Sequence, residues 1–294
     1  MDTITLGDVE VARVYEHQGI RLPREFVFPD SDPALWRGDE RWVERDFWDS
    51  DTDELFFNMQ TWVLRSEGRT ILVDTGIGDD KERPGDPVLH QRKSDFLANL
   101  AAVGVAPEDV DVVVCTHVHG DHVGWNTRLV DGEWVPTFGN ARYLIARADF
   151  DYWNPVNGHQ TRLADVFADS VAPVHQAGLA ELWDDDHYDI DANLRLEPAP
   201  GHTPGSAVLW LRSGSDRAAF VGDLLHTPAQ VLDPDRNPCF DEDQARARAT
   251  RRAVLDRVAS DNALLVPAHL GGAGAAEVRA EGGGYTISGW AAFQ

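Results

Sequence analysis

The sequence predicts an α/β fold built from layers of sheet and helix. Two stretches, 59–76 and 206–223, each contain two apolar runs separated by turn residues, which indicates β-hairpins. Helical patterns follow them at 94–105 and 241–261. Strands that alternate with helices are typical of layered α/β folds, and 294 residues fit one large domain or two modest ones.

The first hairpin stretch reads MQTWVLRSEGRTILVDTG. We expect strands over Trp62–Leu64 and Thr70–Val73, with a turn at Glu67 and Gly68. The second strand ends in Asp74. An acidic residue directly after a strand lies at the edge of the sheet.

The second hairpin stretch reads SAVLWLRSGSDRAAFVGD and follows the same plan. Val208 and Trp210 alternate along its first strand, the turn lies around Gly214, and the second strand, Ala218–Val221, leads to Asp223. The two stretches form a weak internal repeat, which predicts two β-rich halves that are each followed by helical sequence.

Two helices are expected between and after the hairpins. Ser94 is a candidate N-cap for the first helix, which should end near Gly104. The second follows Asp241, and its apolar stripe is expected at Ala249, Ala253, Leu255 and Val258. Residues 1–55 show weak periodicity and are expected to form an N-terminal arm of a single domain spanning 1–294, and 152–191 reads as irregular.

Composition excludes several classes of partner. The net charge of −24 argues against nucleic acid and anionic membranes, because both are bound through clustered Lys and Arg. The N-terminal sequence has no basic flank and no long apolar core, and no apolar run is long enough to span a bilayer. With Cys115 and Cys239 as the only cysteines, we expect a cytoplasmic protein without a disulfide framework.

A short buried strand, expected within EDVDVVVCTH, leads to a cluster of potential ligands: His117, His119, Asp121 and His122. His117 and His119 are two positions apart, so their side chains project to the same side of an extended segment. A polar loop or a pH-sensitive cluster is the alternative, but uncoordinated histidines at this spacing would repel one another when protonated. Imidazole and carboxylate groups are suitable zinc ligands, so the cluster predicts part of a metal site.

Three further residues complete the ligand set. His202 in PAPGHTPGSA, Asp223 in FVGDLLH and His269 in LLVPAHLGG each follow an apolar or Pro-bounded run and are flanked by Gly or Pro. We expect all three on tight loops at the ends of strands.

The order H-x-H-x-D-H, G-H-T-P-G, G-D and A-H resembles the metallo-β-lactamase-fold hydrolase superfamily over about 59–270. The resemblance implies a four-layer αββα sandwich with two divalent metal ions, most simply Zn²⁺, at one edge of the sheets. It implies that His117, His119 and His202 hold the first metal, that Asp121, His122 and His269 hold the second, and that Asp223 bridges both. Asp74 matches a position that supports a ligand rather than acting as one.

Further motifs, including FFNMQTWVLR and GDLLHTPAQ, resemble the branch that contains methyl parathion hydrolase and quorum-quenching lactonases. This resemblance implies a hydroxide bridging the metals that attacks a small ester-like substrate, with a lactone of the acyl-homoserine type as first choice. His226 would donate to the oxyanion and Asp121 or Asp223 would move the proton. Lactonases commonly have tyrosine where His226 stands, as a contact to the substrate carbonyl.

The alternatives are an organophosphate triesterase or arylesterase, and a redox enzyme with one iron that is similar to persulfide dioxygenases. A nuclease is disfavoured by the charge of −24. Trp125 and Trp153 are expected near the pocket, the remaining histidines (His17, His90, His159, His175 and His187) are expected at the surface or in packing, and a homodimer formed through the N-terminal arm is implied by analogy.

Overall fold

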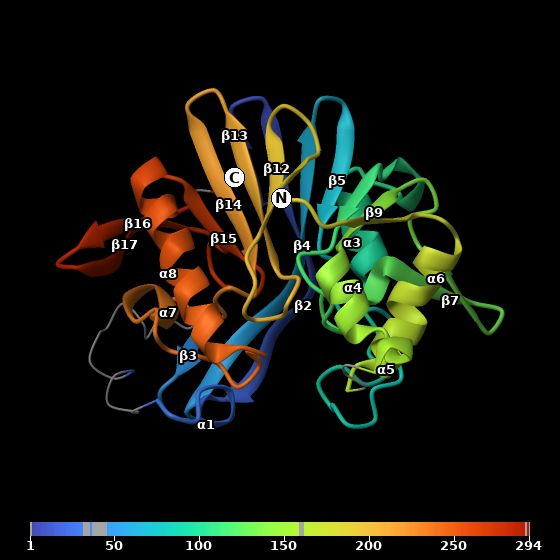
Figure 1. The fold of residues 1–294 in the computed structure, drawn as a ribbon, viewed down its shortest axis with the longest axis horizontal. Coiled ribbons are helices and arrows are strands. Elements are labelled where there is room, and N and C mark those ends of the chain that lie inside the picture. The colour runs from blue at the N-terminus through green and yellow to red at the C-terminus, as the bar shows by residue number, and fades with distance from the viewer. Residues whose placement is uncertain (1, 32–35, 37–45, 159–161, 292, 294) are drawn as a thin grey trace.

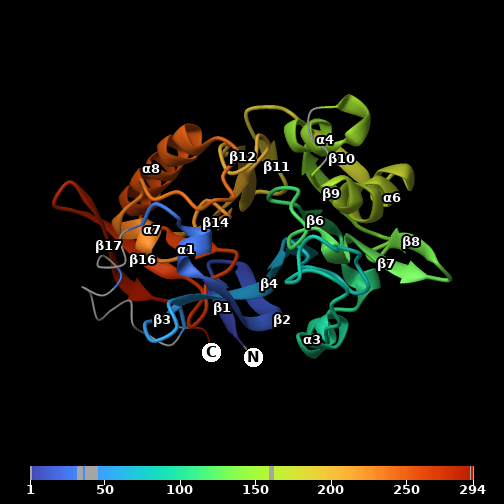
Figure 2. The same ribbon diagram turned by 90° about the horizontal axis from the view of Figure 1, so that it is seen from below.

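In the computed structural model, which describes residues 2–31, 36, 46–158, 162–291 and 293, two sheets pack face to face (Figure 1). The first has eight strands in the order β1-β2-β4-β5-β6-β9-β10, with β3 paired to β4. The second has seven strands, β11 to β17, in sequence order, and β7 and β8 form a separate hairpin. Helices cover both outer faces, as Figure 2 shows from below.

The strands of the first sheet and the separate hairpin are β1 (Thr3–Leu6), β2 (Val9–Pro23), β3 (Trp48–Asp49), β4 (Glu54–Ser66), β5 (Arg69–Val73), β6 (Val112–Val114), β7 (Thr127–Val130), β8 (Glu133–Pro136), β9 (Arg142–Ala146) and β10 (Ala180–Trp183). The strands of the second sheet are β11 (Tyr188–Asp189), β12 (Leu194–Pro198), β13 (Ala207–Ser213), β14 (Asp216–Gly222), β15 (Leu264–Pro267), β16 (Ala276–Glu281) and β17 (Gly284–Trp290).

The helices are α1 (Arg24–Val27), α3 (Phe96–Ala102), α4 (Arg147–Trp153), α5 (Ala164–Val166), α6 (Ala172–Gln176), α7 (Ala229–Leu232) and α8 (Gln244–Asp261). Short 3-10 turns lie at η2 (Pro107–Asp109), η3 (Gly124–Asn126) and η4 (Pro155–Asn157), and one π-helical turn, η5 (Phe167–Val171), joins α5 to α6. In the described part of the chain, no helix combines the length and apolarity needed to cross a membrane.

Successive side chains along a strand point to opposite faces of its sheet, and this alternation produces the layers. Trp62 and Leu64 of β4 point into the core between the two sheets, whereas Val63 packs on the outer side with α3. In β13, Leu209 faces the core between the sheets, and Trp210 packs with Leu255 of α8. The result is the four-layer αββα arrangement that the family resemblance implies.

Both hairpins are confirmed. β4 and β5 are joined through Glu67 and Gly68, which have φ of 48° and 77°, and Gly214 turns between β13 and β14 with φ of 56°. Glycine populates this left-handed region without steric cost. The predicted buried strand is β6.

The helices differ from prediction in detail. The N-cap of α3 is Asp95 rather than Ser94, although the hydroxyl of Ser94 accepts from the Phe96 N–H at 3.4 Å. The predicted stripe of α8 is wrong at Ala249 and Ala253, which are exposed. The buried face of α8 consists of Ala247, Arg251, Leu255 and Val258. The stretch 152–191, expected to be irregular, contains α5, η5, α6 and β10 in its described part.

Of the expected N-terminal arm, β1 and β2 pair into the first sheet, and 32–35 and 37–45 lie outside the described residues. The C-terminal end of β2 and the N-terminal end of β4 extend beyond the sandwich (Figure 1). There Phe57 and Met59 of β4 pack in a cluster with α1 and Trp48. This extension places apolar side chains of β4 beside the candidate site.

Candidate metal centre

The candidate ligands lie on loops that follow strands at one edge of the sandwich. The chain leaves β6 at Cys115 and enters the loop with the histidine cluster, and His202 follows β12. Asp223 follows β14 directly, and His269 comes two residues after β15, which runs parallel to β14. Because these strands end at the same edge, residues up to 152 positions apart in sequence meet there.

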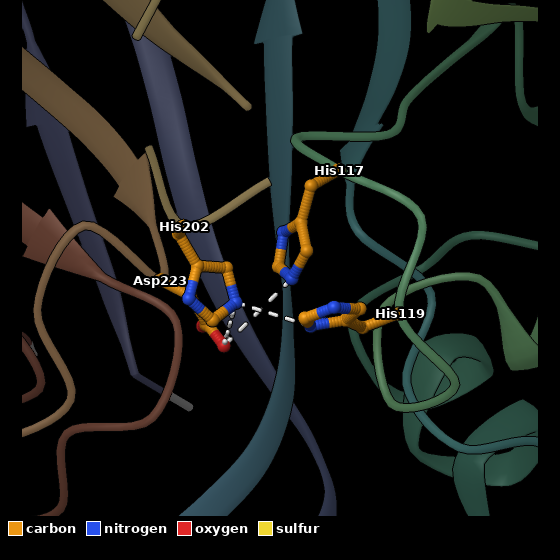
Figure 3. A group of neighbouring side chains, drawn as sticks. All are labelled: His117, His119, His202 and Asp223. Carbon is orange, nitrogen blue, oxygen red and sulfur yellow. Dashed lines mark hydrogen bonds and ion pairs between the residues drawn. The ribbon is translucent and has the colours of Figure 1, made fainter. Parts of the chain in front are cut away.

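Four side chains form the first group: His117, His119, His202 and Asp223 (Figure 3). Their ligand atoms lie within 4.8 Å of one another. Nε2 of His202 is 3.1 Å from Nδ1 of His119, and Oδ2 of Asp223 is 3.4 Å from Nε2 of His202 and 3.8 Å from Nε2 of His117. Three imidazoles and a carboxylate thus point at one volume.

Asp121, His122 and His269 form the second group, also within 4.8 Å. Nε2 of His269 lies 3.2 Å from Nε2 of His122 and 3.5 Å from Oδ2 of Asp121. Oδ1 of Asp223 lies 3.0 Å from Nε2 of His269 and 3.3 Å from Nε2 of His122. Asp223 therefore presents Oδ2 to the first group and Oδ1 to the second.

The chemistry of these donors fits divalent cations. Imidazole nitrogens that face each other at 3.1 and 3.2 Å, and a buried Nε2 of His117 without a hydrogen-bond partner among the described residues, are poorly satisfied by protein alone. Burial lowers the pKa of His117 and His119 well below the ordinary value, which favours the neutral imidazole that binds metal.

In the second group, nearby carboxylates raise the pKa of the histidines instead of lowering it. Burial opposes the charged form of His122, but Asp223, Asp121 and Asp74 together raise its pKa well above the ordinary value. Burial likewise disfavours ionised Asp223, yet His122, His269 and His226 hold the pKa of this carboxyl well below its usual range. A buried carboxylate kept ionised among imidazoles is suited to bind two cations.

Hydrogen bonds to Nδ1 orient several of the rings. Nδ1 of His122 lies 2.8 Å from Oδ2 of Asp74, Nδ1 of His202 lies 3.0 Å from Oδ1 of Asp241, and Nδ1 of His269 lies 3.0 Å from the Asn58 carbonyl. Such contacts fix the tautomer and leave Nε2 free for a metal. Asp74 thus contacts a candidate ligand and does not belong to either ligand group, in agreement with the role that the family resemblance implies for its position.

Asp149 of α4 joins two of the ligand loops. Its carboxylate accepts from the N–H of Val118 at 2.8 Å, from the N–H of Gly205 at 2.6 Å and from the hydroxyl of Thr203 at 2.9 Å. Neither Asp149 nor Asp241 was expected to support a candidate ligand. Asp149 lies in the motif RADFDYW, and Asp241 lies at the start of the helix expected at 241–261, but neither signal indicates which group the carboxylate contacts.

His226 lies at the edge of the centre, with Nε2 3.1 Å from Oδ2 of Asp223. Its backbone N–H donates to Oε1 of Gln230 at 2.7 Å, which fixes the turn after Asp223. Burial lowers the pKa of His226, so its ring is neutral and carries one N–H donor. The ring faces the same cavity as Asp121 and Asp223.

A cavity of about 620 Å³ opens over both groups. His119, Asp121, Asp223, His226 and His269 form its floor, and Arg162 is a basic residue of its wall. Much of the wall is apolar, formed by Leu22, Phe26, Phe57, Met59, Val88, Leu89, Leu163 and Phe240.

Trp125 and Trp153, which were expected near the pocket, do not line this cavity, although Trp153 packs against His119, which does. Trp125 is buried and donates from Nε1 to Oε1 of Glu16 at 2.7 Å, and Trp153 packs edge-on against His119 at 5.5 Å. Phe57, Phe240 and Phe26 take the role instead. Of the other histidines, His17, His90, His175 and His187 lie away from the ligand groups and the cavity, and His159 lies outside the described residues.

Comparison with known families gives the class. The model of the metallo-beta-lactamase superfamily matches residues 57–269, which is more than half of the chain and includes every candidate ligand. The chain belongs to the metallo-beta-lactamase superfamily. The family and the fold class that the sequence motifs indicate are therefore confirmed.

Individual relatives share about 30% identity with part of this chain. Metallo-beta-lactamase domain-containing protein 1 of Xenopus laevis is 31% identical over 179 residues, covering 60% of this chain and 61% of that protein. The N-acyl homoserine lactonase AttM of Azorhizobium caulinodans is 30% identical over 126 residues, covering 40% of this chain and 42% of the lactonase. The chain therefore spans less than two thirds of either relative.

Solved structures share the fold along the whole chain. The dizinc quorum-quenching lactonase AidC, in complex with a product, superposes with a TM-score of 0.78 at 20% identity, covering 99% of this chain and 98% of that one. The hydrolase AbOPH of the beta lactamase superfamily gives a TM-score of 0.80 at 20% identity, covering 99% and 97%. Together with the cluster of His and Asp side chains, the family supports the binding of divalent metal ions by this chain.

Proposed function

We propose that this chain is a metal-dependent hydrolase with a binuclear centre, most simply of two Zn²⁺ ions, that opens a lactone carrying an apolar acyl chain. One observation carries the binuclear part of the proposal. Asp223 presents one carboxylate oxygen to each of two ligand groups, at 3.0 to 3.8 Å from their imidazole nitrogens. A carboxylate placed between two such groups is suited to bridge two cations.

His117, His119 and His202 would hold one ion, Asp121, His122 and His269 the other, and Asp223 both. When bound, two such ions supply a nucleophile at neutral pH by lowering the pKa of a water from about 15.7 towards about 7, and they polarise the substrate carbonyl. The chain is anionic overall, but bound cations would dominate the local field.

Three side chains have roles in proton transfer and charge stabilisation under this proposal. The neutral ring of His226, at the cavity floor, is placed to donate its N–H to the oxygen that gains charge when the carbonyl is attacked. Asp121 and Asp223 also face the cavity, so either carboxylate is placed to carry a proton to the leaving oxygen.

The apolar wall supports an acyl chain as part of the substrate. Phe57 contacts the rings of both His226 and His269 edge-on, at 6.5 and 6.0 Å, so the apolar surface reaches the reacting centre. Burial of a methylene group contributes about 0.8 kcal/mol, so several carbons would add substantially to affinity. Relatives named as N-acyl homoserine lactonases agree with this substrate class.

A phosphotriester is the second candidate substrate, because His226 stands where lactonases commonly have a tyrosine that contacts the substrate carbonyl. A centre with one iron, as in persulfide dioxygenases, is less well supported. The second group has its own ligands, Asp121, His122 and His269, and these would have no function in an enzyme with a single metal.

An activity panel on protein of measured metal content tests the proposal. The panel contains acyl-homoserine lactones of several chain lengths, simple γ- and δ-lactones, aryl esters and phosphotriesters. We expect two zinc ions per chain and the highest kcat/KM for a lactone with a long acyl chain. Preference for phosphotriesters over every lactone would overturn the substrate, and one iron per chain would overturn the binuclear centre.

A further inference from the structure

Arg251 occupies the buried face of α8, at a position between Ala247 and Leu255 where an apolar side chain would be expected. The arginine is fully buried. A charged group in the interior is costly unless each of its donors finds an acceptor and its charge finds a partner. The contacts of Arg251 therefore indicate what its burial achieves.

The guanidinium of Arg251 reaches two segments that carry candidate ligands. Its Nε donates to the Leu224 carbonyl at 2.7 Å, in the residue directly after Asp223. Its Nη2 donates to Oδ2 of Asp241 at 3.2 Å, and the side chains of both partners are 1% exposed or less. The remaining nitrogen, Nη1, donates to the carbonyls of Pro234 and Arg236 at 2.7 and 3.1 Å.

Asp241 contacts His202 as well as Arg251. Its second oxygen, Oδ1, lies 3.0 Å from Nδ1 of His202, whose Nε2 faces His119 and Asp223. The ring is thus held by a chain of contacts from Arg251 through Asp241. The same arginine holds the backbone beside Asp223, so one side chain orients two of the four members of the first group.

The second group has separate supports. His122 is held by Asp74, and His269 by the Asn58 carbonyl, and Arg251 contacts neither of these. Asp223 is shared by both groups, so a change at Arg251 reaches the second group only through Asp223, whereas it reaches the first group through both His202 and Asp223. A change at Arg251 should therefore affect the first group more than the second.

We propose that Arg251 is a positioning residue that sets the affinity of the His117, His119, His202 and Asp223 group for its metal ion. This inference rests on the proposed binuclear centre. Arg251 neutralises the buried carboxylate of Asp241 and keeps it as an acceptor for Nδ1–H of His202, which leaves Nε2 as the ligand atom. Without the arginine, Asp241 is a buried and unpaired carboxylate, and the orientation of the His202 ring is no longer fixed.

A purely structural role makes a different prediction. Because Arg251 also binds the carbonyls of Pro234 and Arg236, its loss would lower stability in any case. A loss of stability alone would lower the affinity for the two metal ions equally or leave both affinities unchanged. Only the positioning role predicts that the affinity for one ion falls while the affinity for the other is retained.

The test is titration of the metal-free full chain with Zn²⁺ in competition with a chromophoric chelator. Arg251→Met should weaken one of two sites by about 10- to 100-fold, with the other within a few-fold of wild type. Asp241→Asn, which keeps the shape of the side chain, should weaken the same single site. Arg252→Met is the matched control, because Arg252 lies next on α8 in an exposed ion pair with Asp235.

A double variant separates the sites further. Arg251→Met combined with Asp241→Asn should lose little more affinity than either single variant, since the two residues act in one chain of contacts. Arg251→Met combined with Asp74→Asn should weaken both sites, because Asp74 supports the second group.

Folded Arg251→Met protein that binds both ions as tightly as wild type, or that loses both equally, would overturn the positioning role. If Arg251→Met does not fold, Asp241→Asn decides by the same criterion. Wild-type protein that binds no pair of ions would instead refute the binuclear centre itself, so the two failures can be distinguished.

Discussion

Oδ2 of Asp74 lies 2.8 Å from Nδ1 of His122, and the same carboxylate accepts from both the N–H and the hydroxyl of Thr116 at 2.8 Å. Asp74 has a φ of 58°, a left-handed conformation that aspartate and asparagine tolerate better than most residues. The aspartate that ends the first hairpin therefore connects the strand edge to a candidate ligand.

Asp74→Asn should weaken metal binding while the backbone stays unchanged. The amide presents a donor where the carboxylate accepts, so it opposes either Thr116 or the Nδ1–H of His122. We expect the affinity for one metal ion to fall by about 10- to 100-fold, measured by zinc titration. Asp80→Asn is the control, since Asp80 also has a positive φ, of 62°, but its side chain pairs with Lys93 outside the site. Equal zinc affinity in both variants would refute this role.

Phe240→Ala should change the preference for chain length. Phe240 lines the cavity, packs against His226 at 5.6 Å and meets Phe26 edge-on at 5.9 Å. We expect KM for a decanoyl lactone to rise by about tenfold, the effect of losing about 1.4 kcal/mol of apolar contact, and KM for a butanoyl lactone to change little.

Phe56→Ala is the control for this prediction, because Phe56 lies under Arg21 and does not line the cavity. Steady-state kinetics on both substrates check it. A Phe240 variant in which KM rises equally for both chain lengths would show that Phe240 does not contact the acyl chain.

Asp169→Asn should strongly destabilise the fold. Asp169 accepts two hydrogen bonds from the guanidinium of Arg83, at 2.7 and 2.8 Å, and lies 3.6 Å from the buried Nζ of Lys81. Removing the carboxylate leaves the buried guanidinium of Arg83 without its anion, so we expect the free energy of unfolding to fall by about 3–5 kcal/mol in urea titrations.

The exposed pair of Arg252 and Asp235 has the same two-bond geometry and provides the comparison. Asp235→Asn should leave stability nearly unchanged, because solvent screens exposed pairs. Similar losses in both variants would show that burial does not govern the contribution of the Asp169 cluster.

Glu16 should give stability a particular dependence on pH. Burial raises its pKa to about 7 from 4.5, although the N–H groups of Ile77 and Gly78 and Nε1 of Trp125 donate to it. Since the folded-state pKa is the higher one, the contribution of Glu16 is fully present below pH 4.5 and is lost as pH rises through about 7.

Urea unfolding of metal-free wild type and Glu16→Gln across this range measures the effect. Any loss of stability that the glutamine causes at every pH cancels when the two profiles of unfolding free energy against pH are subtracted. We expect wild type to lose stability relative to the variant between pH 4.5 and 7. Parallel profiles would show that folding does not raise the pKa of Glu16.

The candidate ligands could be picked out from the sequence because each stands in a short motif at a strand end. His117 to His122 follow a strand of three valines, and His202, Asp223 and His269 are flanked by Gly or Pro. These local signals are independent of the rest of the chain. The structure places all seven residues in two adjoining groups.

The supports and the cavity could not be predicted in the same way. Arg251 was not expected inside because an arginine in a helix is ordinarily exposed, and its acceptors come from segments up to 27 positions away. The cavity wall combines Phe26, Phe57, Leu89 and Phe240, which come from four separate segments. Such long-range contacts are set by the packing of layers and leave no periodic pattern in the sequence.

Anomalous scattering from crystals of the zinc-loaded protein, measured at the zinc edge, would locate the bound ions themselves. We expect two peaks, one among His117, His119 and His202 and the other among Asp121, His122 and His269, with Asp223 between them. A single peak, or no peak within reach of Asp223, would contradict the proposed binuclear centre.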